Sequence, residues 1–412
     1  MMETAGANLE KMLSDFKFEG RGKRTQKQAV DIGTQHIPAY INEFWTAKQR
    51  QASSIHEISY RACFKPQLPR FFIERLTGPG DVVYDPFGGR GTTAVEAGLL
   101  GRKAISNDVN PLSETLTRPR LEVPSLKDIA ARLDEVKFDA CAKADRDLSM
   151  FYHPATLAEM VSLREYLCER KAKDLEDALD RWIRMVATNR LTGHSPGFFS
   201  VYTLPPNQAT SPKSQVKINK AREQEPEYRD VKKLILRKSK SLLRTLTGTE
   251  GRNLRESAKT AMFLTEDSRH TSAIKSNSVR LTVTSPPFLD IVQYSQDNWL
   301  RCWFNGIDDG VVSKRMTMSR TIDDWAQVMG QTFKELYRIT RPGGWVAFEV
   351  GEVRKGKIRL EESVVPIGMN AGFGCEAIVI NSQKFTKTSN IWGVDNNECG
   401  TNTNRIVLMR KR

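Results

Sequence analysis

The sequence predicts an α/β fold with a doubly wound, mostly parallel seven-stranded sheet and a large helical insertion. Three observations support this prediction. A short apolar run leads into a glycine-rich turn, a helix-forming stretch, a second apolar run and an acidic residue, which is the usual opening of such a sheet. Helical spacing of apolar residues then dominates for about 140 residues. Strand patterns return from Met262 onward.

The length of 412 residues exceeds that of a typical single domain and predicts either two domains or one domain with an insertion. We divide the chain into four parts. Residues 1–54 are read as an N-terminal arm with a short helix near Ile41–Arg50. Residues 55–123 and 262–412 are read as the two halves of the α/β core. Residues 124–261 are read as the mostly helical insertion.

Each strand of the predicted sheet is a short apolar or β-branched run that stops at a turn signal. These runs span residues 81–84, 103–106, 262–264, 279–284, 345–350, 376–380 and 405–409, and a turn is expected at Arg341-Pro342-Gly343-Gly344. The insertion shows apolar residues at helical spacing instead. They form two stripes, one of Leu175, Leu179, Trp182 and Val186, the other of Val231, Ile235, Leu242 and Leu246.

The composition, with 39% apolar and 27% charged residues, is typical of a soluble globular protein. No stretch has the roughly 18–20 consecutive apolar residues that a membrane-spanning helix needs, and the first residues lack the pattern of a secretory signal. The six cysteines include no C-x-x-C pair. We therefore expect no metal site, no disulfide framework, no membrane association and a cytoplasmic location.

The net charge of +14 points to a polyanionic partner. The distribution of charge strengthens this interpretation, because the stretch from Lys213 to Lys259 holds 14 basic and 6 acidic residues. Within it, Lys233, Arg237, Lys240 and Arg244 form a basic stripe offset from the apolar stripe of the same predicted helix. Such a helix would bury one face and present the other to phosphates, although a charge run is often only a solvated face.

Two segments have the residue types of a binding or catalytic site. The first, Asp85-Pro86-Phe87-Gly88-Gly89-Arg90-Gly91-Thr92-Thr93, lies between a strand and a helix, where glycines let the backbone approach a ligand closely. Its spacing is neither that of a Walker A loop nor that of a dinucleotide fingerprint. Asp108 ends the next strand, at the position where an acid can bind ribose hydroxyls. Together they favour an adenosine-type cofactor.

The second segment, Thr284-Ser285-Pro286-Pro287-Phe288, follows a later strand. Two successive prolines remove two backbone donors and leave carbonyl groups that can only accept hydrogen bonds. The aromatic residue beside them offers a flat stacking surface. This combination suits a planar group that carries an amine, whereas the tripeptide Ser-Pro-Pro alone would favour an ordinary strand-ending loop.

Taken together, the two segments closely resemble the amino-methyltransferases of DNA, whose cofactor loop typically reads DPFxGSGTT and whose catalytic loop reads SPP(Y/F) or (D/N)PP(Y/F). The serine form is associated with methylation of cytosine N4, the aspartate or asparagine form with adenine N6. The resemblance covers roughly residues 55–120 and 262–412. It departs from the family pattern at Arg90, where serine is usual, and in placing the cofactor half before the catalytic half.

The resemblance implies a Rossmann-like methyltransferase core that uses S-adenosyl-L-methionine as its cofactor. By matching positions, Asp108 would hold the ribose and Asp267 would approach the adenine amine. The segment from Tyr60 to Pro69 would pack near the methionine end of the cofactor. The residues expected to hold the methionine part are Asp85, Pro86, Phe87, Gly89, Gly91, Thr92 and Thr93.

The resemblance also implies how the reaction would proceed. The Ser285 side chain and the Pro286 carbonyl would hold an exocyclic amine in line with the methyl group, with Pro287 keeping the loop rigid and Phe288 stacking on a base flipped out of the duplex. No separate general base is identified. Methylation of cytosine C5 needs a cysteine after a proline, and none of the six cysteines follows one. The loop Lys384–Asn404 resembles the segment that clamps the flipped base.

The leading hypothesis is a site-specific DNA cytosine-N4 methyltransferase that binds double-stranded DNA, through Lys233, Arg237, Lys240 and Arg244 of the insertion among other contacts. A cognate restriction enzyme is a candidate partner, and the sequence decides neither this partnership nor the choice between monomer and dimer. Two alternatives stay open: methylation of adenine N6 or of an RNA base, and a non-catalytic DNA-binding subunit. The enzymatic hypothesis requires residues 85–93 and 284–288 to lie together although about 190 residues separate them.

Overall fold

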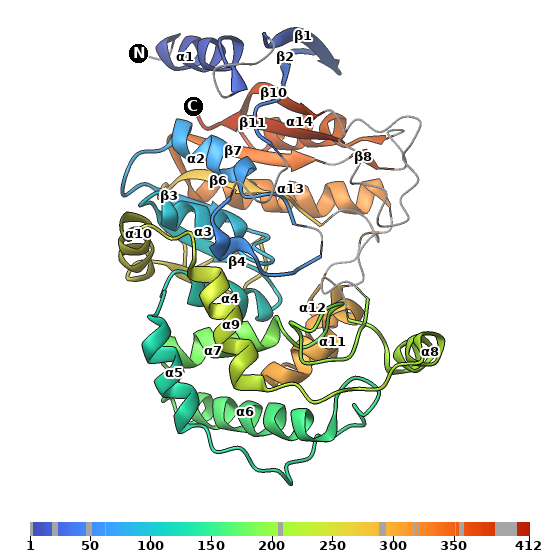
Figure 1. Ribbon diagram of the computed structural model, residues 1–412. Coiled ribbons are helices and arrows are strands. Elements are labelled where there is room, and N and C mark those ends of the chain that lie inside the picture. Colours follow the sequence, from blue (N-terminus) through green and yellow to red (C-terminus); the bar gives the residue numbers. More distant parts are fainter. Residues whose placement is uncertain are drawn as a thin grey trace.

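The computed structural model describes the whole chain except residues 1–2, 19–23, 47–51, 62, 205–208, 288–293, 317–318, 320, 351, 354–357 and 384–401. The described residues form one nine-stranded sheet in the order β1-β2-β10-β11-β7-β6-β3-β4-β5 and a separate two-stranded sheet, β8-β9. Figure 1 shows the main sheet stacked above a group of helices contributed by the insertion. The strands are β1 (Gln26–Ile32), β2 (Gln35–Asn42), β3 (Val82–Asp85), β4 (Lys103–Asn107), β5 (Met262–Leu264), β6 (Val279–Thr284), β7 (Thr340–Val350), β8 (Glu352–Val353), β9 (Ile358–Arg359), β10 (Gly374–Gln383) and β11 (Asn402–Arg410).

The seven strands predicted from sequence are confirmed as β3, β4, β5, β6, β7, β10 and β11. Neighbouring pairs from β5 to β7 are parallel, while β11 runs antiparallel to both of its neighbours. The turn expected at 341–344 lies inside β7, where the pairing with β6 jumps from Thr340 to Trp345. The doubly wound, mostly parallel α/β sheet is therefore present.

The arm differs from the prediction. No helix is formed over 41–46, the described part of the expected helix, because Ile41 and Asn42 end strand β2. Strands β1 and β2 form a hairpin, and β2 pairs in parallel with β10, which extends the sheet to nine strands. Beyond β2, the side-chain oxygen of Asn381 accepts hydrogen bonds from the backbone amides of Phe44 and Trp45. Pairing with a distant strand thus overrides the local preference.

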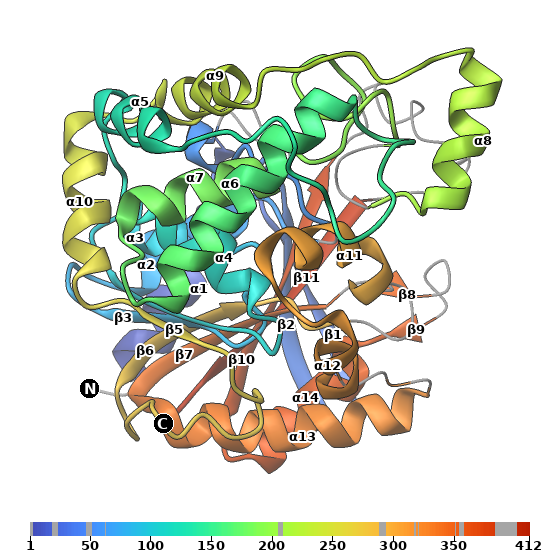
Figure 2. The same ribbon diagram turned by 90° about the horizontal axis from the view of Figure 1, so that it is seen from below.

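Helices cover both faces of the sheet, as Figure 2 shows. Buried apolar residues of α13 (Ile322–Ile339) and α14 (Glu361–Asn370) pack on one face, together with Phe348 and Val350 of β7. The other face holds Trp345 and Ala347 of β7 and is covered by α2 (Gln67–Leu76) and α3 (Thr92–Leu99). The alternation of β7 side chains between two apolar layers defines the doubly wound core.

The segment 124–261 lies between β4 and β5 and contains six helices among its described residues. They are α5 (Leu126–Glu135), α6 (Pro154–Ala172), α7 (Ala178–Thr188), α8 (Pro212–Arg222), α9 (Val231–Leu243) and α10 (Gly248–Ala258). Val231, Ile235 and Leu242 of the predicted stripe are buried on α9, whereas Leu246 lies after the helix and is half-buried. The Trp182 indole of α7 donates to the Ser239 hydroxyl of α9 at 3.0 Å. Leu175 does not join the predicted stripe of α7, because it precedes the helix and is 54% exposed.

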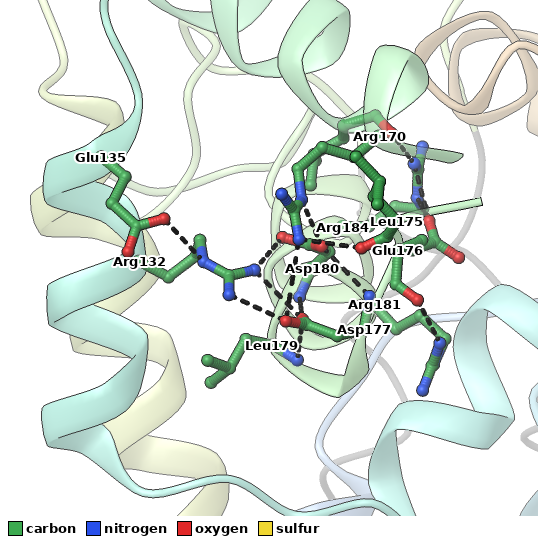
Figure 3. Close-up of polar contacts among 11 residues, drawn as sticks. Arg132, Glu135, Arg170, Leu175, Glu176, Asp177, Leu179, Asp180, Arg181 and Arg184 are labelled. Carbon is green, nitrogen blue, oxygen red and sulfur yellow. Dashed lines mark hydrogen bonds and ion pairs between the residues drawn. The ribbon is translucent and has the colours of Figure 1, made fainter. Parts of the chain in front are cut away.

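A buried ion-pair network joins α5, α6 and α7 (Figure 3). The Asp180 carboxylate is fully buried and accepts from Arg132 at 2.5 Å and from Arg170 at 2.7 Å. Asp177 caps α7 and also pairs with Arg132 at 2.8 Å. A buried carboxylate needs paired charges to offset its desolvation, and here Asp180 of α7 has one such partner on α5 and one on α6.

Six further helical elements complete the described chain. Helix α4 (Leu112–Thr117) and the short 3-10 helix η4 (Arg118–Arg120) follow β4, and the helices α11 (Tyr294–Asn305) and α12 (Asp309–Arg315) follow β6. Helix α1 (Glu3–Ser14) and the 3-10 helix η3 (Ser54–His56) belong to the arm and its junction with the core. Among the described residues, no helix combines the length and the apolar character needed to span a bilayer.

Candidate active site

The candidate site lies at the edge of the sheet where β3, β4 and β6 end. These strands are parallel, with β3 between the other two, so their carboxyl ends face the same edge. The residues that end or follow them are Asp85, Asp108 and Ser285. In open α/β sheets, ligands bind at this edge.

Hydrogen bonds connect the two segments that the sequence singled out. The Thr284 hydroxyl donates to the buried Asp85 carboxylate at 2.6 Å, and the Thr93 hydroxyl donates to the Val283 carbonyl at 3.0 Å. Burial raises the pKa of Asp85 to about 6, against the opposing effect of the hydrogen bonds that it accepts from Thr284 and the Phe87 amide. The glycine loop and the strand leading to the Ser-Pro-Pro loop are therefore in direct contact.

The glycine loop has a conformation that side chains would not fit. Gly91 has φ +72°, and a Cβ atom added to it would lie 2.1 Å from the Thr117 hydroxyl of α4. At Gly88, an added Cβ would lie 2.3 Å from the Ser106 hydroxyl of β4. The loop therefore packs closely on β4 and α4 and turns sharply into α3. The first turn of α3 contains no acidic residue that would repel a negatively charged ligand group. A helix N-terminus reached through such a loop can accept an electron-rich ligand group.

Asp108 positions this loop. Its carboxylate accepts from the Gly89 amide at 2.8 Å and from the Asn110 amide at 2.9 Å, while burial raises its pKa. At the same edge, the Asn107 side chain bonds the backbone of Glu266 and the Pro86 carbonyl, which ties the ends of β4 and β5 to the loop. The contact of Asp108 with a ribose stays a prediction.

Asp267 lies just after β5, and its carboxylate is bound by Arg269 through two nitrogens, at 2.9 Å and 2.5 Å. The hydrogen bond from Arg269 lowers the pKa of Asp267. The side chain of Asp267 is 41% exposed and lies on the same edge of the sheet. Its expected contact with an adenine amine would require sharing the carboxylate with Arg269.

Arg90 has a structural role at the position where the resembling family has serine. Its guanidinium is buried and donates to the Ile58 carbonyl at 2.9 Å and to the Thr92 hydroxyl at 3.2 Å. The Tyr60 ring lies 3.5 Å from the Cβ position of Gly89. The beginning of the segment expected beside the cofactor loop is therefore packed on it. Burial, and next the charge of Arg90, lower the pKa of the neighbouring Arg120 to about 9.

The catalytic segment is described from Thr284 to Pro287, and Phe288 lies outside the described residues. Pro286 is buried and Pro287 is exposed. The indole of Trp325, on α13, donates to the Pro287 carbonyl at 3.0 Å. The sequence analysis did not predict this contact. It connects the second proline to α13, the helix on the face of the sheet opposite to α2 and α3.

Glu349 is a residue of the site that the sequence analysis missed. It lies near the end of β7, is 7% exposed, and accepts hydrogen bonds from Ser285 and Asn404. Burial raises the pKa of Glu349 to about 7, although both hydrogen bonds oppose the shift. A glutamate inside the apolar run Trp345–Val350 was the available signal, because acidic residues are almost never fully buried unless they are paired.

The four basic residues proposed for DNA contact are all exposed on α9 or just after it. Arg244 forms a two-nitrogen ion pair with Glu57, and Arg237 donates to the Pro196 carbonyl at 3.1 Å. Phe198 and Phe199, in the loop between α7 and α8, are both buried. Of the loop Lys384–Asn404, only 402–404 are described.

Among the described residues, no group of three or more His, Cys, Asp or Glu side chains is placed to hold a metal ion. The site defined by the fold is a glycine loop, two acids at strand ends and a proline-rich loop on one sheet edge.

A comparison with known protein families matches the part of the chain that contains the glycine loop and Asp108. Residues 14–115 match the sequence profile of a family described as DNA methylase (N6_N4_Mtase). The chain is 31% identical over 77 residues to the type II methyltransferase M.MjaII of Methanocaldococcus jannaschii, covering 18% of this chain and 14% of that protein. It is 45% identical over 53 residues to the type II methyltransferase M.PvuII of Proteus hauseri, covering 13% of this chain and 16% of that protein.

The matched stretches thus span about a seventh of the length of these relatives. Among solved structures, a SAM-dependent methyltransferase from Methanosarcina mazei is similar with a TM-score of 0.33 and 9% identity, over 82% of this chain and 96% of that one. The family match covers residues 14–115, which include the glycine loop and Asp108.

Proposed function

We propose that this protein is an S-adenosylmethionine-dependent DNA methyltransferase that methylates an exocyclic amine, and specifically N4 of a flipped-out cytosine. The observation that supports this most directly is the hydrogen bonding of Asp85 to Thr284 and of Thr93 to Val283. It brings a loop suited to an adenosine-type cofactor next to a loop suited to a planar amine. The matches to DNA methylases support the substrate class.

The residues present fit the cofactor. Gly88 and Gly91 pack closely on β4 and α4, which holds the backbone of the loop 88–91 in its sharp turn, and α3 begins directly behind it. Gly89, Gly91, Thr92 and Thr93 would hold the methionine part together with Asp85, Pro86 and Phe87. Asp108 would hold the ribose, and Asp267 would bind the adenine amine. When bound, S-adenosylmethionine supplies a methyl group that is already activated as a sulfonium.

The remaining work is positioning. The Ser285 hydroxyl and the Pro286 carbonyl would accept from the amine and direct its lone pair at the methyl group. The Trp325 indole donates to the Pro287 carbonyl, which would hold the second proline in place. Phe288 is assigned to stacking on the flipped base. The serine in Ser285-Pro286-Pro287 is the feature that favours cytosine N4 over adenine N6.

The DNA contact is proposed for the exposed face of α9. Lys233, Arg237 and Lys240 are exposed there and would contact phosphates, whereas Arg244 is already paired with Glu57. The type II methyltransferases that match this chain suggest a cognate restriction endonuclease as a functional partner. The insertion 124–261 would carry sequence recognition.

Expression of the chain in a host without endogenous DNA methylation tests the proposal. Sequencing that distinguishes N4-methylcytosine should find this base at one recognition sequence. The variant S285A should fold and bind DNA normally, and should reduce methylation by orders of magnitude. Finding N6-methyladenine alone would establish the adenine alternative. A calorimetric titration without cofactor binding would favour the non-catalytic one.

A further inference from the structure

A buried carboxylate stands behind the proposed catalytic serine. Glu349 lies on β7, which pairs in parallel with β6, and the register places Thr284 opposite Phe348. The residues that follow this pair, Ser285 and Glu349, are therefore adjacent across the ladder. A hydrogen bond joins the Ser285 side chain to the Glu349 carboxylate.

The second partner of Glu349 comes from the neighbouring strand β11. The Asn404 amide donates to the Glu349 carboxylate. An amide donor of this kind can orient the carboxylate but cannot neutralise it, so the charge of Glu349 has no compensating ion pair among these contacts. Burial of a carboxylate without a paired charge is costly, and such groups are found where function requires them.

The other charged side chains around β7 do not supply that pair. Arg405 of β11 pairs with Glu361 on the opposite face of the sheet, and Arg280 of β6 binds the Leu76 and Gly343 carbonyls at the far end of its strand. Helix α13 also packs on the opposite face. Its charged residues are Asp323, Asp324, Lys334, Glu335 and Arg338, and Arg410 lies at the far end of β11. Within the part of the chain that the structure describes, the hydrogen-bond partners of the Glu349 carboxylate are Ser285 and Asn404, and both are uncharged.

The proposed reaction leaves a proton to be removed. When the amine nitrogen forms its bond to the methyl carbon, the carbon–sulfur bond breaks and its electron pair stays on sulfur. The nitrogen then carries a positive charge and one proton too many. Neutral product requires that proton to leave, and the Ser285 hydroxyl is already placed beside the amine in the proposed function.

We infer that Glu349 is the proton acceptor of the reaction, acting through Ser285. The inference rests on the proposed function. The Ser285 oxygen takes the proton from the methylated amine while its own proton passes to the Glu349 carboxylate. Both protons move in the same direction, so the net result is transfer of one proton from the amine to Glu349, and the hydroxyl is regenerated. Because Glu349 acts through Ser285, it is a positioning residue rather than a group that touches the base. Asn404 orients its carboxylate.

The acceptor must be ionised to work, and burial raises the pKa of Glu349 to about 7. Turnover should therefore rise with pH through a single ionisation near 7 when DNA and cofactor are saturating. The hydrogen bond from Ser285 lowers the pKa of Glu349, so removing that hydroxyl should move the ionisation to higher pH. Both expectations follow from the same contact.

The test uses the full chain and two readouts. In the free protein, carbon-13 NMR of labelled glutamate side chains should show one carboxyl titrating near pH 7, absent in E349Q and shifted upward in S285A. In turnover assays, E349Q should lower kcat by about 10²- to 10⁴-fold, the usual contribution of a general base, and leave KM for DNA within a few-fold. Its remaining activity should lack the rise near pH 7.

E361Q is the matched control, because Glu361 is a buried glutamate on the opposite face of the same sheet. It should keep the wild-type pH profile. A wild-type protein that methylates DNA with no ionisation near 7, or an E349Q variant with wild-type kcat, would overturn the inference while leaving the proposed function intact. A wild-type protein that methylates nothing at any pH would instead overturn the proposed function.

Discussion

Replacing Gly91 by alanine should damage the glycine loop in a way that can be calculated from its surroundings. Gly91 has φ +72°, and an added Cβ would lie 2.1 Å from the hydroxyl and 2.6 Å from the Cβ of Thr117. Alanine in this backbone region costs about 1–2 kcal/mol. Forcing an extra methyl into a packed region costs about a further 1–3 kcal/mol. We expect G91A to lower the free energy of unfolding by about 2–5 kcal/mol.

The two contributions can be separated by a double-mutant cycle with Thr117. In the T117G background the obstructing atoms are gone, so G91A should cost only the backbone part, about 1–2 kcal/mol. G33A is the control for that part. Gly33 has φ +58° in the turn between β1 and β2, and an added Cβ would meet no atom within 4 Å.

Urea denaturation followed by circular dichroism measures each of the four unfolding free energies, and calorimetry with S-adenosylmethionine measures cofactor binding. G91A should also lose cofactor binding, since the loop cannot keep its shape against α4. Equal costs of G91A in the wild-type and T117G backgrounds would refute the packing of Gly91 on Thr117. A cost no larger than that of G33A would refute it as well.

Three further predictions follow from individual contacts. E349Q should raise the free energy of unfolding at pH 8 by up to about 3 kcal/mol. The reason is that the pKa of this carboxyl is raised to about 7 in the folded state, so its stabilising contribution is lost as pH rises through 7. Below pH 4 the carboxyl is protonated in both states, and thermal melts of E349Q should show no gain. D180N should lower the free energy of unfolding, measured by urea denaturation, by about 3–5 kcal/mol, because Arg132 and Arg170 lose their buried partner. E135Q alters an exposed partner of Arg132 and should lower it by less than about 1 kcal/mol. Neutralising Lys233, Arg237 and Lys240 together should weaken DNA binding and reduce the slope of log K against log salt concentration by about 2–3. R244Q should change this slope little, because Arg244 is paired with Glu57. An unaltered slope in the triple variant would place α9 away from DNA.

The strands of the core could be predicted because each is a short apolar run that stops at a strong turn signal. The run 81–84 ends at Asp85-Pro86, and the run 279–284 ends at Ser285-Pro286. Their adjacency at the sheet edge followed from the resemblance, and the Asp85–Thr284 hydrogen bond shows that the two segments are in contact. For the positions of these strands, local sequence was sufficient, because each apolar run and the turn residues after it agree with the strand that forms.

Other features depend on contacts between distant segments and could not be predicted locally. The arm forms strands because β2 gains a partner in β10, more than 300 residues later. Arg90 is buried because the Ile58 carbonyl accepts from it, and Leu175 is exposed because the helix begins only at Ala178. Glu349 becomes part of the site only through the register between β6 and β7. None of these partners is visible within a short sequence window.

The most direct test of the central claim is a methyl-transfer assay with tritiated S-adenosylmethionine and duplex DNA, followed by digestion to nucleosides and chromatography. If residues 85–93 and 284–287 form one site, wild-type protein should place the label in N4-methyldeoxycytidine. Neither G91A nor S285A should transfer the label. G91A should also lose cofactor binding, whereas S285A should keep it. Label transferred equally well by S285A, or absent from every nucleoside with wild-type protein and bound cofactor, would contradict the claim.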